Sequence, residues 1–519
     1  MLPSTAFSLS LLSLLCIIIL QSPRTCSSLP FKSRGSDGEK EDKDGPAISV
    51  RGAAAALSPQ KSSYSNPIVD EFFQAASFDF ESESSIALKK ELQTLTATTT
   101  LKTFLTETRR QLHKHPELMY QEEFTSETIQ IALKELDIEF SSGWSKNTRQ
   151  DAIPGSGGYG VVADIGSGNG PCIILRADMD ALPIEEETHL INQFKSTQRG
   201  KMHACGHDGH TTMLLGAAAI LKQMEDSIVG TVRLMFQPAE EGGAGAKRMV
   251  EEGVIDMEPK AQYAFGIHVW PQLPSKTIAA GRGPLLAAVE VFEVHLSGKG
   301  GHAAMPHMTI DPIVAASSAV LNLQTIISRT LSPLESGVVS VTQLTAGESF
   351  NVIPASAIIK GTIRALRIDT LMSLRDRVEH IIHANAELHH CNATIRYMPD
   401  FYPPTVNDPT LFDTFSKHVG SLVSSEKKVR DVKPTMGGED FSFLAQAIPS
   451  TFFLLGQGTG QDTDHHLPAT DFGLHHPQFA LDEDVMPTGV ELHVNLALRG
   501  LKKLSVDLAS GDSVDVEEL

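Results

Sequence analysis

The stretch GHTTMLLGAAAILKQMEDSIVGTVRLMFQPAEE, residues 209–241, decides the fold class. Up to Met224 it has the apolar spacing of a helix, and the rest is an apolar run that ends in two glutamates. Strand-like runs precede it at 158–166 and 171–183, and another, YAFGIHVW, follows at 263–270. Strands that alternate with helices predict a mixed or parallel α/β sheet with helices on both faces.

The pattern changes near Leu286, where strand-like and helical runs follow in the order β-α-β-β-α-β. This order within about a hundred residues describes a small ferredoxin-like α+β domain. We therefore expect an inserted domain that interrupts a larger one. The expected segments are the larger domain at 91–285 and 401–505, the inserted domain at 286–400, and an acidic tail at 506–519.

The composition of the chain limits the kinds of molecule that we expect the protein to bind. The chain has 519 residues and a formal net charge of -20, from 43 basic and 63 acidic side chains. A strongly negative protein is poorly suited to phosphate backbones or anionic lipid, so we expect no nucleic acid partner. After the N-terminal region no stretch is long and apolar enough for a membrane helix, so we expect no stable membrane insertion. Small molecules or proteins remain as partners.

The N-terminal region predicts targeting followed by disorder. An apolar run from Leu9 to Leu20 fits a cleaved signal peptide at 1–26, with the secretory pathway and the endoplasmic reticulum as the destination. A plastid transit peptide is the alternative, because serines are frequent and no acidic residue precedes Asp37. Residues 27–90 are rich in polar residues without a sustained apolar period, which predicts a disordered extension.

The stretch MHACGHDGH, residues 202–210, raises the question of a metal site. A histidine and a cysteine two residues apart are often packing residues, but other candidate ligands accompany them. Glu240 and Glu241 follow a strand-like run, His268 ends another, and His475 and His476 precede a proline. Ligand sites in α/β sheets lie at the carboxyl ends of strands, and thiolate, imidazole and carboxylate all bind divalent cations. A redox site is excluded because no C-x-x-C spacing occurs.

The adjacent glutamates predict different roles for their two carboxylates. If the strand end turns the two side chains apart, one carboxylate binds metal while the other remains free as a base. The free carboxylate then takes a proton from a water molecule and passes it to a leaving amine. The alternative is that the two glutamates lie in a solvated turn and have no catalytic role. The apolar strand that precedes them disfavours this interpretation.

Eight motifs between Leu101 and Lys503 carry a resemblance to a known family. They are RADMDALP, MHACGHDGH, QPAEEGGAGA, FGIHVWP, SGKGGHAAMPH, NVIPASA, MGGEDFSF and LHHPQF. Together they resemble the amidohydrolase branch of the di-metal aminoacylase and carboxypeptidase family, and within it the plant auxin-conjugate hydrolases. The resemblance implies an α/β fold, with a di-metal exopeptidase-like catalytic domain and an inserted ferredoxin-like α+β domain.

The resemblance also implies the site residues. Two divalent metal ions, with manganese as the usual activator, would be held by Cys205 as a bridging thiolate, His207, Glu241, His268 and His475. Glu240 would be the general base. Of the histidine pair, His475 matches the family ligand because it directly follows the leucine.

Five further residues match supporting positions. Asp178 and Asp180 match carboxylates that orient the ligands, although either is also compatible with an ordinary strand-end carboxylate. His302 lies among glycines and would present its imidazole to a developing oxyanion, in its own subunit or in a partner's. Asn351 and Arg364 are candidates for binding the carboxylate of the substrate, with a plain strand-surface charge as the alternative for Arg364.

The expected function is hydrolysis of the amide bond that joins an amino acid to a small carboxylic acid such as indole-3-acetic acid, with jasmonoyl conjugates as a related class. A general N-acyl-amino-acid hydrolase or carboxypeptidase is the alternative enzyme. The non-enzymatic alternative is a protein that binds conjugates without cleaving them. The presence of Glu240 together with the ligand set disfavours it. A homodimer is also considered. His113 and His115 are interpreted as structural residues near the N-terminus of the folded part.

Overall fold

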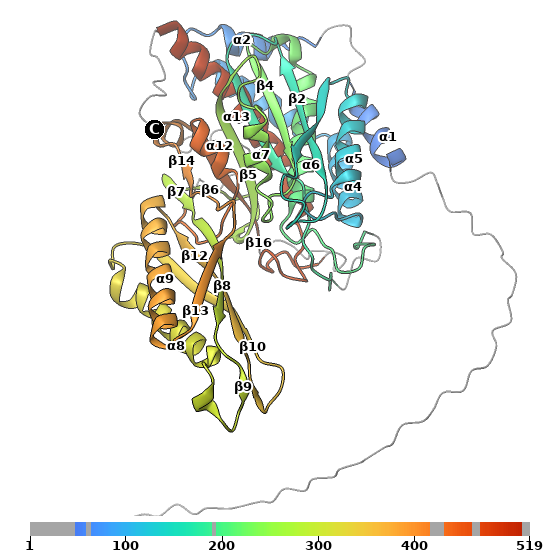
Figure 1. The fold of residues 1–519 in the computed structure, drawn as a ribbon. Coiled ribbons are helices and arrows are strands. Elements are labelled where there is room, and N and C mark those ends of the chain that lie inside the picture. The colour runs from blue at the N-terminus through green and yellow to red at the C-terminus, as the bar shows by residue number, and fades with distance from the viewer. Residues whose placement is uncertain (1–46, 59–63, 189–193, 416–429, 459–467, 511–519) are drawn as a thin grey trace, which may run out of the picture. The chain divides into compact units, whose positions relative to one another are not determined.

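The larger domain is built on an eight-stranded sheet (Figure 1). The structure is a computed structural model, and it describes residues 47–58, 64–188, 194–415, 430–458 and 468–510. In sheet order the strands are β1 (Phe140–Lys146), β2 (Gly157–Gly166), β4 (Thr231–Gln237), β3 (Cys172–Asp178), β5 (Ala261–Pro274), β16 (Ser450–Gly458), β6 (Ile278–Ala280) and β15 (Arg430–Asp431).

The four central strands, β4, β3, β5 and β16, run parallel to their neighbours in this group. Their apolar residues face both sides. In β3, Ile173 and Leu175 belong to the core on one face of the sheet, and Ile174 belongs to the core on the other. Both faces are buried because helices cover each of them, as the continuous apolar runs predicted. The predicted α/β class is therefore confirmed.

Helix α6 (His207–Lys222) carries the fold-deciding stretch, and all of its residues are buried. It packs against the sheet, α4 (Thr99–Lys114) and α13 (Met486–Ser510). A helix that is apolar on every side must be covered on every side, which explains the alanine-rich sequence. The same core includes residues of α5 (Glu123–Glu135), while residues of α7 (Gly245–Glu251) and α12 (Ser442–Ala447) belong to the opposite core.

The inserted domain has a four-stranded antiparallel sheet with its own core. Its strands, in sheet order, are β10 (Gly337–Ala346), β12 (Ser356–Ala365), β8 (Ala288–Ser297) and β13 (Asn392–Tyr397). Helices α8 (Pro312–Thr325) and α9 (Ile368–Leu388) pack against them (Figure 1). The chain order is therefore β-α-β-β-α-β, as the sequence predicted. A short pair, β9 (Gly301–His302) and β11 (Val352–Ile353), is added to it.

Two chain segments connect the domains, and they pair with each other. β7 (Gly283–Leu286) leads into the inserted domain and β14 (Thr405–Asn407) leads out of it, and these strands are antiparallel partners. The remaining short elements are α10 (Pro409–Phe415) and the helical turns η1 (Glu225–Ser227), η2 (Pro306–Met308), η3 (Ile326–Thr330) and η5 (Glu483–Val485). None of the described helices has the length and apolar character that crossing a membrane requires.

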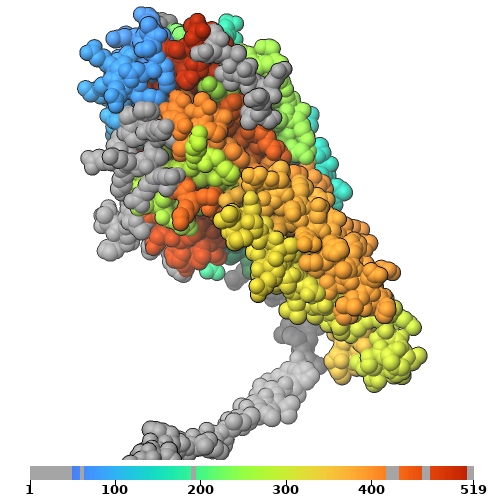
Figure 2. Space-filling model, turned by 90° about the vertical axis from the view of Figure 1, so that its left-hand side faces the viewer, coloured from blue at the N-terminus to red at the C-terminus, as the bar shows by residue number. Residues whose placement is uncertain are grey.

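The prediction of disorder for residues 27–90 is wrong wherever the structure describes them. Three helices occur there: α1 (Ala47–Leu57), α2 (Pro67–Gln74) and α3 (Glu83–Thr96). Side-chain caps start α2 and α3, and the helices pack on α4, α5 and α13, so blue N-terminal atoms lie beside red C-terminal ones in Figure 2. Each helix is short and buries few side chains, so no long apolar period marks it in the sequence.

The other terminal predictions have mixed outcomes. The predicted signal peptide and residues 27–46 lie outside the described residues. At the other end, α13 continues to Ser510, so residues 506–510 extend the helix and are not part of a tail.

We predict that Leu88→Ala lowers the free energy of unfolding by about 2 to 5 kcal/mol, because Leu88 is 0% exposed in the main core. The matched control is Ile86→Ala on the same helix, where the side chain is 47% exposed and the expected change is within about 0.5 kcal/mol. Urea unfolding of both variants measures the difference. Equal effects would mean that the N-terminal helices are not docked.

Candidate metal centre

The predicted ligands gather at one edge of the sheet, where the parallel strands β3 and β4 end. Asp178 is the last residue of β3, and Glu240 and Glu241 follow β4 after a short turn. His268 lies on the neighbouring strand β5, and His207 begins α6. The carboxyl ends of parallel strands are the usual place for ligand sites in such sheets.

Four of the predicted ligands approach one another directly. Donor atoms of Cys205, His207 and Glu241 lie within 4.8 Å of one another. Nε2 of His475 lies 3.1 Å from Oε1 of Glu241. His475 has a left-handed backbone, with φ of 63°, and its N–H donates to the carbonyl of Ala204 at 2.8 Å. This bond places His475 beside the cysteine although the two are far apart in the sequence.

His268 completes the set of five. Its Nε2 lies 3.5 Å from Sγ of Cys205, and its Nδ1 donates to the carbonyl of Val269 at 2.7 Å, which leaves Nε2 as the free donor atom for a metal. Gly206 permits this approach. A Cβ there would lie 2.4 Å from Val269, and the φ of 90° is one that other residues rarely adopt.

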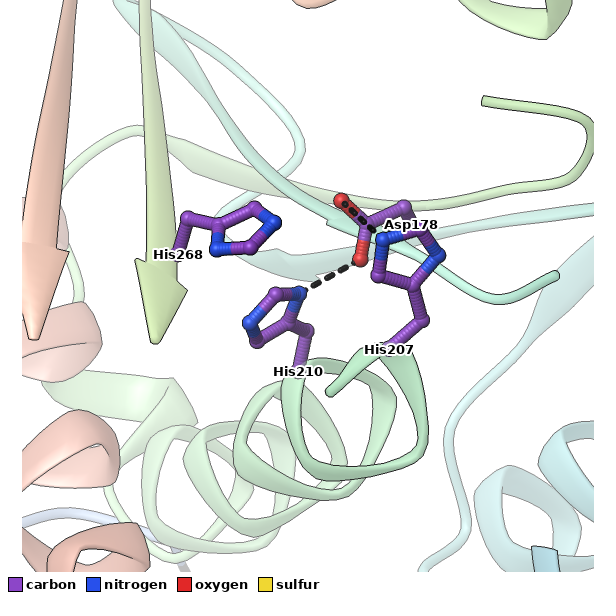
Figure 3. Close-up of side chains that lie close together, drawn as sticks. All are labelled: Asp178, His207, His210 and His268. Carbon is purple, nitrogen blue, oxygen red and sulfur yellow. Dashed lines mark hydrogen bonds and ion pairs between the residues drawn. The ribbon is translucent and has the colours of Figure 1, made fainter. Parts of the chain in front are cut away.

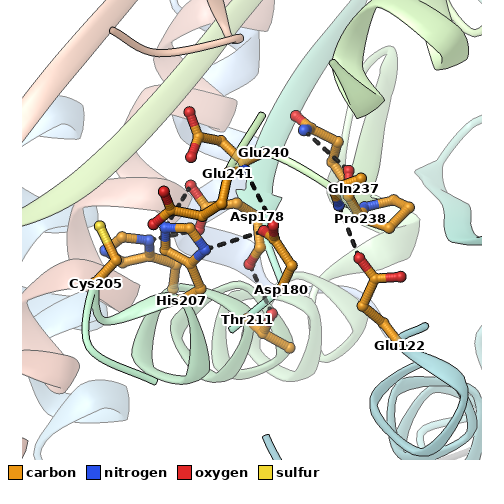
Figure 4. Close-up of polar contacts among 12 residues, drawn as sticks. Glu122, Asp178, Asp180, Cys205, His207, Thr211, Gln237, Pro238, Glu240 and Glu241 are labelled. Carbon is orange, nitrogen blue, oxygen red and sulfur yellow. Dashed lines mark hydrogen bonds and ion pairs between the residues drawn. The ribbon is translucent and has the colours of Figure 1, made fainter. Parts of the chain in front are cut away.

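Asp180 orients both His207 and Glu241 (Figure 4). One carboxylate oxygen lies 3.2 Å from Nδ1 of His207, and the other accepts the N–H of Glu241 at 3.0 Å. With Nδ1 engaged, Nε2 of His207 is buried and has no hydrogen-bond partner in the described part of the chain. Its nearest charged neighbour is Asp178, with a carboxylate oxygen 3.8 Å away. A buried imidazole nitrogen without a hydrogen bond is the arrangement expected of a metal ligand whose other nitrogen is held by a carboxylate.

Asp178 supports the site through His210, a residue that the sequence analysis left unassigned (Figure 3). Nε2 of His210 accepts the N–H of Val269 at 2.9 Å, so its Nδ1 carries the proton and donates to Asp178 at 2.6 Å. His210 therefore links β3 to the strand that carries His268. The motif contained this histidine, but only the fold shows that it spans two strands.

The electrostatics of the site favour a cation. Burial raises the pKa of Glu240 well above its usual value, and the carboxylates of Glu439 and Glu241 raise it further. Burial also raises the pKa of the Cys205 thiol, and Glu241 and Glu240 add to that effect. Divalent cations would stabilise both anionic groups and reverse these shifts. The donor set, the unpaired nitrogen and the charge thus all fit a site for divalent metal ions.

Arg176 is a further functional residue that the sequence analysis missed. It is fully buried and contacts Asp178 at 2.7 Å, Glu439 at 2.9 Å and Asp440 at 2.8 Å, and it donates to Gln237 at 2.7 Å. Its charge offsets part of the acidic charge beside the metal ligands. The sequence offered one signal, an arginine inside an apolar strand. A buried guanidinium costs free energy unless acidic side chains pair with it, so this arginine indicated acidic partners elsewhere in the sequence.

A cavity of about 480 Å³ opens from these residues toward the inserted domain. Its polar end is formed by Glu240 and by the predicted ligands other than His207, and much of its wall is apolar, including Trp270, Phe452 and Leu474. Arg364 of the inserted domain also lines it and is half-buried, with one N–H donated to the carbonyl of Met436 at 2.7 Å.

Other candidates lie elsewhere. His302 and Asn351 do not line this cavity, because both belong to the region of the β9–β11 pair, where His302 is exposed opposite Val352 and Asn351 bonds Ser349. His476 stacks on Phe472, with ring centroids 4.7 Å apart, and is no part of the ligand cluster.

His113 and His115 are structural, as interpreted from the sequence. His113 is buried, with Nδ1 2.8 Å from a carboxylate oxygen of Asp208, the residue after His207. His115 bonds the carbonyl of Gln111 at the end of its own helix.

Comparisons with known proteins agree with this geometry. Residues 174–499 match the sequence profile of peptidase family M20/M25/M40. The chain is 42% identical over 399 residues to IAA-amino acid hydrolase ILR1-like 4 of Arabidopsis thaliana, covering 76% of this chain and 85% of the relative. It is 38% identical to thermostable carboxypeptidase 1 of Saccharolobus solfataricus, covering 75% of this chain and 94% of that one.

Among solved structures, a dinuclear metal-binding peptidase of the M20 family from Bacillus subtilis is similar, with a TM-score of 0.62 and 33% identity. The match covers 78% of this chain and 99% of that one. The two-metal arrangement is therefore a property of a closely similar fold.

We predict that His475→Ala reduces the metal content of the purified protein after dialysis, because it removes a donor next to Glu241. The matched control is His476→Ala, the adjacent histidine, which stacks on Phe472 and should leave the content at two ions per chain. Elemental analysis by mass spectrometry measures both. A loss of metal confined to the His476 variant would show that the ligand assignment is reversed.

Proposed function

Because the chain belongs to peptidase family M20/M25/M40, we propose that it hydrolyses amide-linked amino acid conjugates of indole-3-acetic acid and releases free hormone and amino acid. The observation that carries this proposal is the pair Glu240 and Glu241 at the polar end of a mostly apolar cavity. One member of the pair is placed among the candidate ligands, and the other faces the space a substrate would occupy.

Two divalent cations, for which we propose manganese, would be held by the cluster described above. The ligands would be Cys205, His207, Glu241, His268 and His475. When bound, such ions polarise a scissile carbonyl and lower the pKa of a coordinated water molecule.

Glu240 acts as the general base in this proposal. The residue is 7% exposed and lines the cavity, and its Oε1 accepts the N–H of Asp440 at 3.4 Å. A buried carboxylate that lines the cavity and is not itself one of the proposed ligands is free to accept the proton of the attacking water. It then delivers that proton to the leaving nitrogen of the amino acid.

Arg364 would bind the carboxylate of the amino acid. It ion-pairs with no acidic side chain of the described residues, and burial lowers its pKa, so an anionic partner would be favourable. The acyl group would lie against the apolar wall that includes Trp270 and Phe452. Indoleacetyl and jasmonoyl groups are both apolar rings with an amide at one end, and we propose jasmonoyl-amino acids as a second substrate class.

A general N-acyl-amino-acid hydrolase or carboxypeptidase is the second candidate, favoured by the similarity to a carboxypeptidase over 75% of the chain. The same catalytic residues would serve it. Only the preference among acyl groups separates the two, because the cavity wall and not the metal cluster would decide it.

We predict that Glu240→Gln abolishes turnover and leaves bound metal unchanged, because the amide keeps the shape of the side chain but cannot accept the proton. Product release from indoleacetyl, jasmonoyl and acetyl amino acids, followed by mass spectrometry, measures the activity and ranks the substrates. Substantial residual activity would contradict the role of Glu240. Cleavage of acetyl amino acids alone would favour the general hydrolase, and no cleavage by the metal-loaded wild type would favour a binding protein.

We also propose a homodimer formed through the inserted domain. β10 is an edge strand of its sheet, and apolar side chains are exposed beside it, with Leu321 at 71% and Leu344 also exposed. A paired edge strand and covered apolar residues would suit a second copy of this chain. His302 would then act in the partner's site, since it lies outside the cavity of its own chain.

We predict that Leu321→Glu together with Leu344→Glu produces a monomer, because buried charges would oppose the interface. Sedimentation velocity measures the oligomeric state of the wild type and the variant. A wild-type protein that sediments as a monomer, or a monomeric variant with full activity, would contradict the contribution of His302 across the interface.

For localisation we propose the secretory pathway, with the endoplasmic reticulum as destination and the plastid as the alternative. The apolar run from Leu9 to Leu20 supports this proposal. Asn392 begins the edge strand β13, is exposed and lies in the sequon NAT, so it is a natural reporter. A mass shift on glycosidase treatment that disappears in Asn392→Gln would place the protein in the secretory pathway, and plastid import would contradict it.

A further inference from the structure

The loop that carries Glu240 has a strained backbone. Between β4 and α7, Ala239 and Ala244 have φ values of 59° and 57°, and Gly242 has 102°. A left-handed conformation at a residue with a Cβ costs about 1 to 2 kcal/mol, so contacts from outside must hold the loop in place. The direction of the Glu240 side chain depends on those contacts.

Tyr402 supplies three of them with one hydroxyl group. Its O–H donates to the carbonyl of Glu240 at 2.5 Å, and the same oxygen accepts the N–H groups of Gly242 at 3.0 Å and Ala244 at 3.1 Å. The hydroxyl therefore links the main chain at Glu240 to the main chain just before α7, and so holds the two ends of this turn together.

Tyr402 does not belong to the loop or to its neighbouring strands. It lies in the segment that leads from β13 of the inserted domain back to β14. Its backbone exchanges two hydrogen bonds with Val289, at 2.9 and 3.0 Å, and Val289 follows the other connection between the domains. The two connecting segments are thus hydrogen-bonded to each other at Tyr402, the residue that holds the loop carrying Glu240.

Asp400 fixes the same segment to the larger domain. Its carboxylate contacts Arg149 at 3.0 Å, Lys247 at 2.7 Å and Arg248 at 2.5 Å, and it is nearly buried. The two basic residues of α7 follow directly after the loop that Tyr402 closes. Three ion pairs to one carboxylate hold this part of the connecting segment on the larger domain. They therefore also fix the position of Tyr402, which is close to Asp400 in the sequence.

We propose that Tyr402 is a positioning residue for Glu240, and that the connecting segment, anchored by Asp400, is part of the support of the catalytic base. This inference rests on the proposed function, because it assigns a role relative to the base. Tyr402 also lines the cavity, but all three hydrogen bonds of its hydroxyl group go to main-chain groups of the loop, so the hydroxyl would act through those peptide groups. The rate of the chemical step would depend on it, and substrate affinity would not.

Tyr402→Phe in the full-length, metal-loaded protein tests this proposal, because only the hydroxyl is removed. We expect kcat to fall about 10- to 100-fold, since small displacements of a catalytic group have effects of this size, with KM within about twofold and two metal ions retained. Tyr120→Phe is the matched control. The hydroxyl of Tyr120 donates to the carbonyl of Gly243 in the same loop at 2.6 Å, but it comes from the larger domain and does not bond Glu240.

For Tyr120→Phe we expect kcat to fall by no more than about threefold, because the peptide group of Glu240 keeps its bonds. Equal losses of kcat in the two variants would overturn the proposal, as would a rise in KM without a fall in kcat. Asp400→Asn should act through the same bonds, so its effect on kcat should not add to that of Tyr402→Phe. Additive effects of the two changes would contradict the role of Asp400 as the anchor.

Hydrogen exchange gives a readout that does not depend on activity. In the metal-free protein, Tyr402→Phe should speed exchange in a peptide covering residues 238–245, because the amide of Ala244 loses its acceptor and the amide of Gly242 keeps only the carbonyl of Glu240. Unchanged exchange would overturn the proposal even if no substrate is cleaved. A wild-type protein without hydrolase activity would instead contradict the proposed function, so the two failures are distinguishable.

Discussion

Buried negative charge at the carboxyl ends of β3 and β4 is the constraint on which the rest of the site depends. Asp178 and Asp180 follow one strand, Glu240 and Glu241 follow the next, and Glu439 joins them from a distant segment. Carboxylates so close together and so well buried are costly unless cations compensate them. Arg176 compensates part of this charge from inside the sheet, and two divalent ions in the cluster would compensate much of the remainder.

The sequence predicted what depends on local pattern. The apolar run before Glu240 and Glu241 marked the end of β4, and the run that contains His268 marked the neighbouring strand β5, which continues beyond that residue to Pro274. Because ligand sites gather at one edge of a parallel sheet, the ligand cluster could be anticipated from Glu241 and His268. Arg176 and Tyr402 could not be anticipated in the same way. Arg176 binds partners more than 200 residues away, and Tyr402 bonds the Glu240 loop from 162 residues further along the chain. Neither partner is indicated by the residues next to it.

The N-terminal helices escaped prediction for a related reason. Their stability comes from docking on helices of the folded domain: α1 packs on α4 and α5, and α3 packs on α13, where the buried guanidinium of Arg499 bonds Ser85. A helix that buries only a few side chains leaves a weak apolar period, and tertiary packing then decides whether it forms. His302 shows the converse limit. Its glycine-rich surroundings marked it as exceptional, but the fold places it outside the cavity of its own chain.

The different tasks of two adjacent glutamates follow from the backbone between them. The N–H of Glu241 is bound by Asp180, which draws that residue toward His207 and the ligand cluster. The carbonyl of Glu240 is bound by Tyr402, and left-handed residues on either side of the pair let the chain turn sharply enough for the side chains to diverge. Chemically identical carboxylates thus acquire separate environments, one beside the ligands and one in the cavity. Since one of the two restraints comes from the segment that joins the domains, the inserted domain takes part in the site beyond the side chains it contributes to the cavity wall.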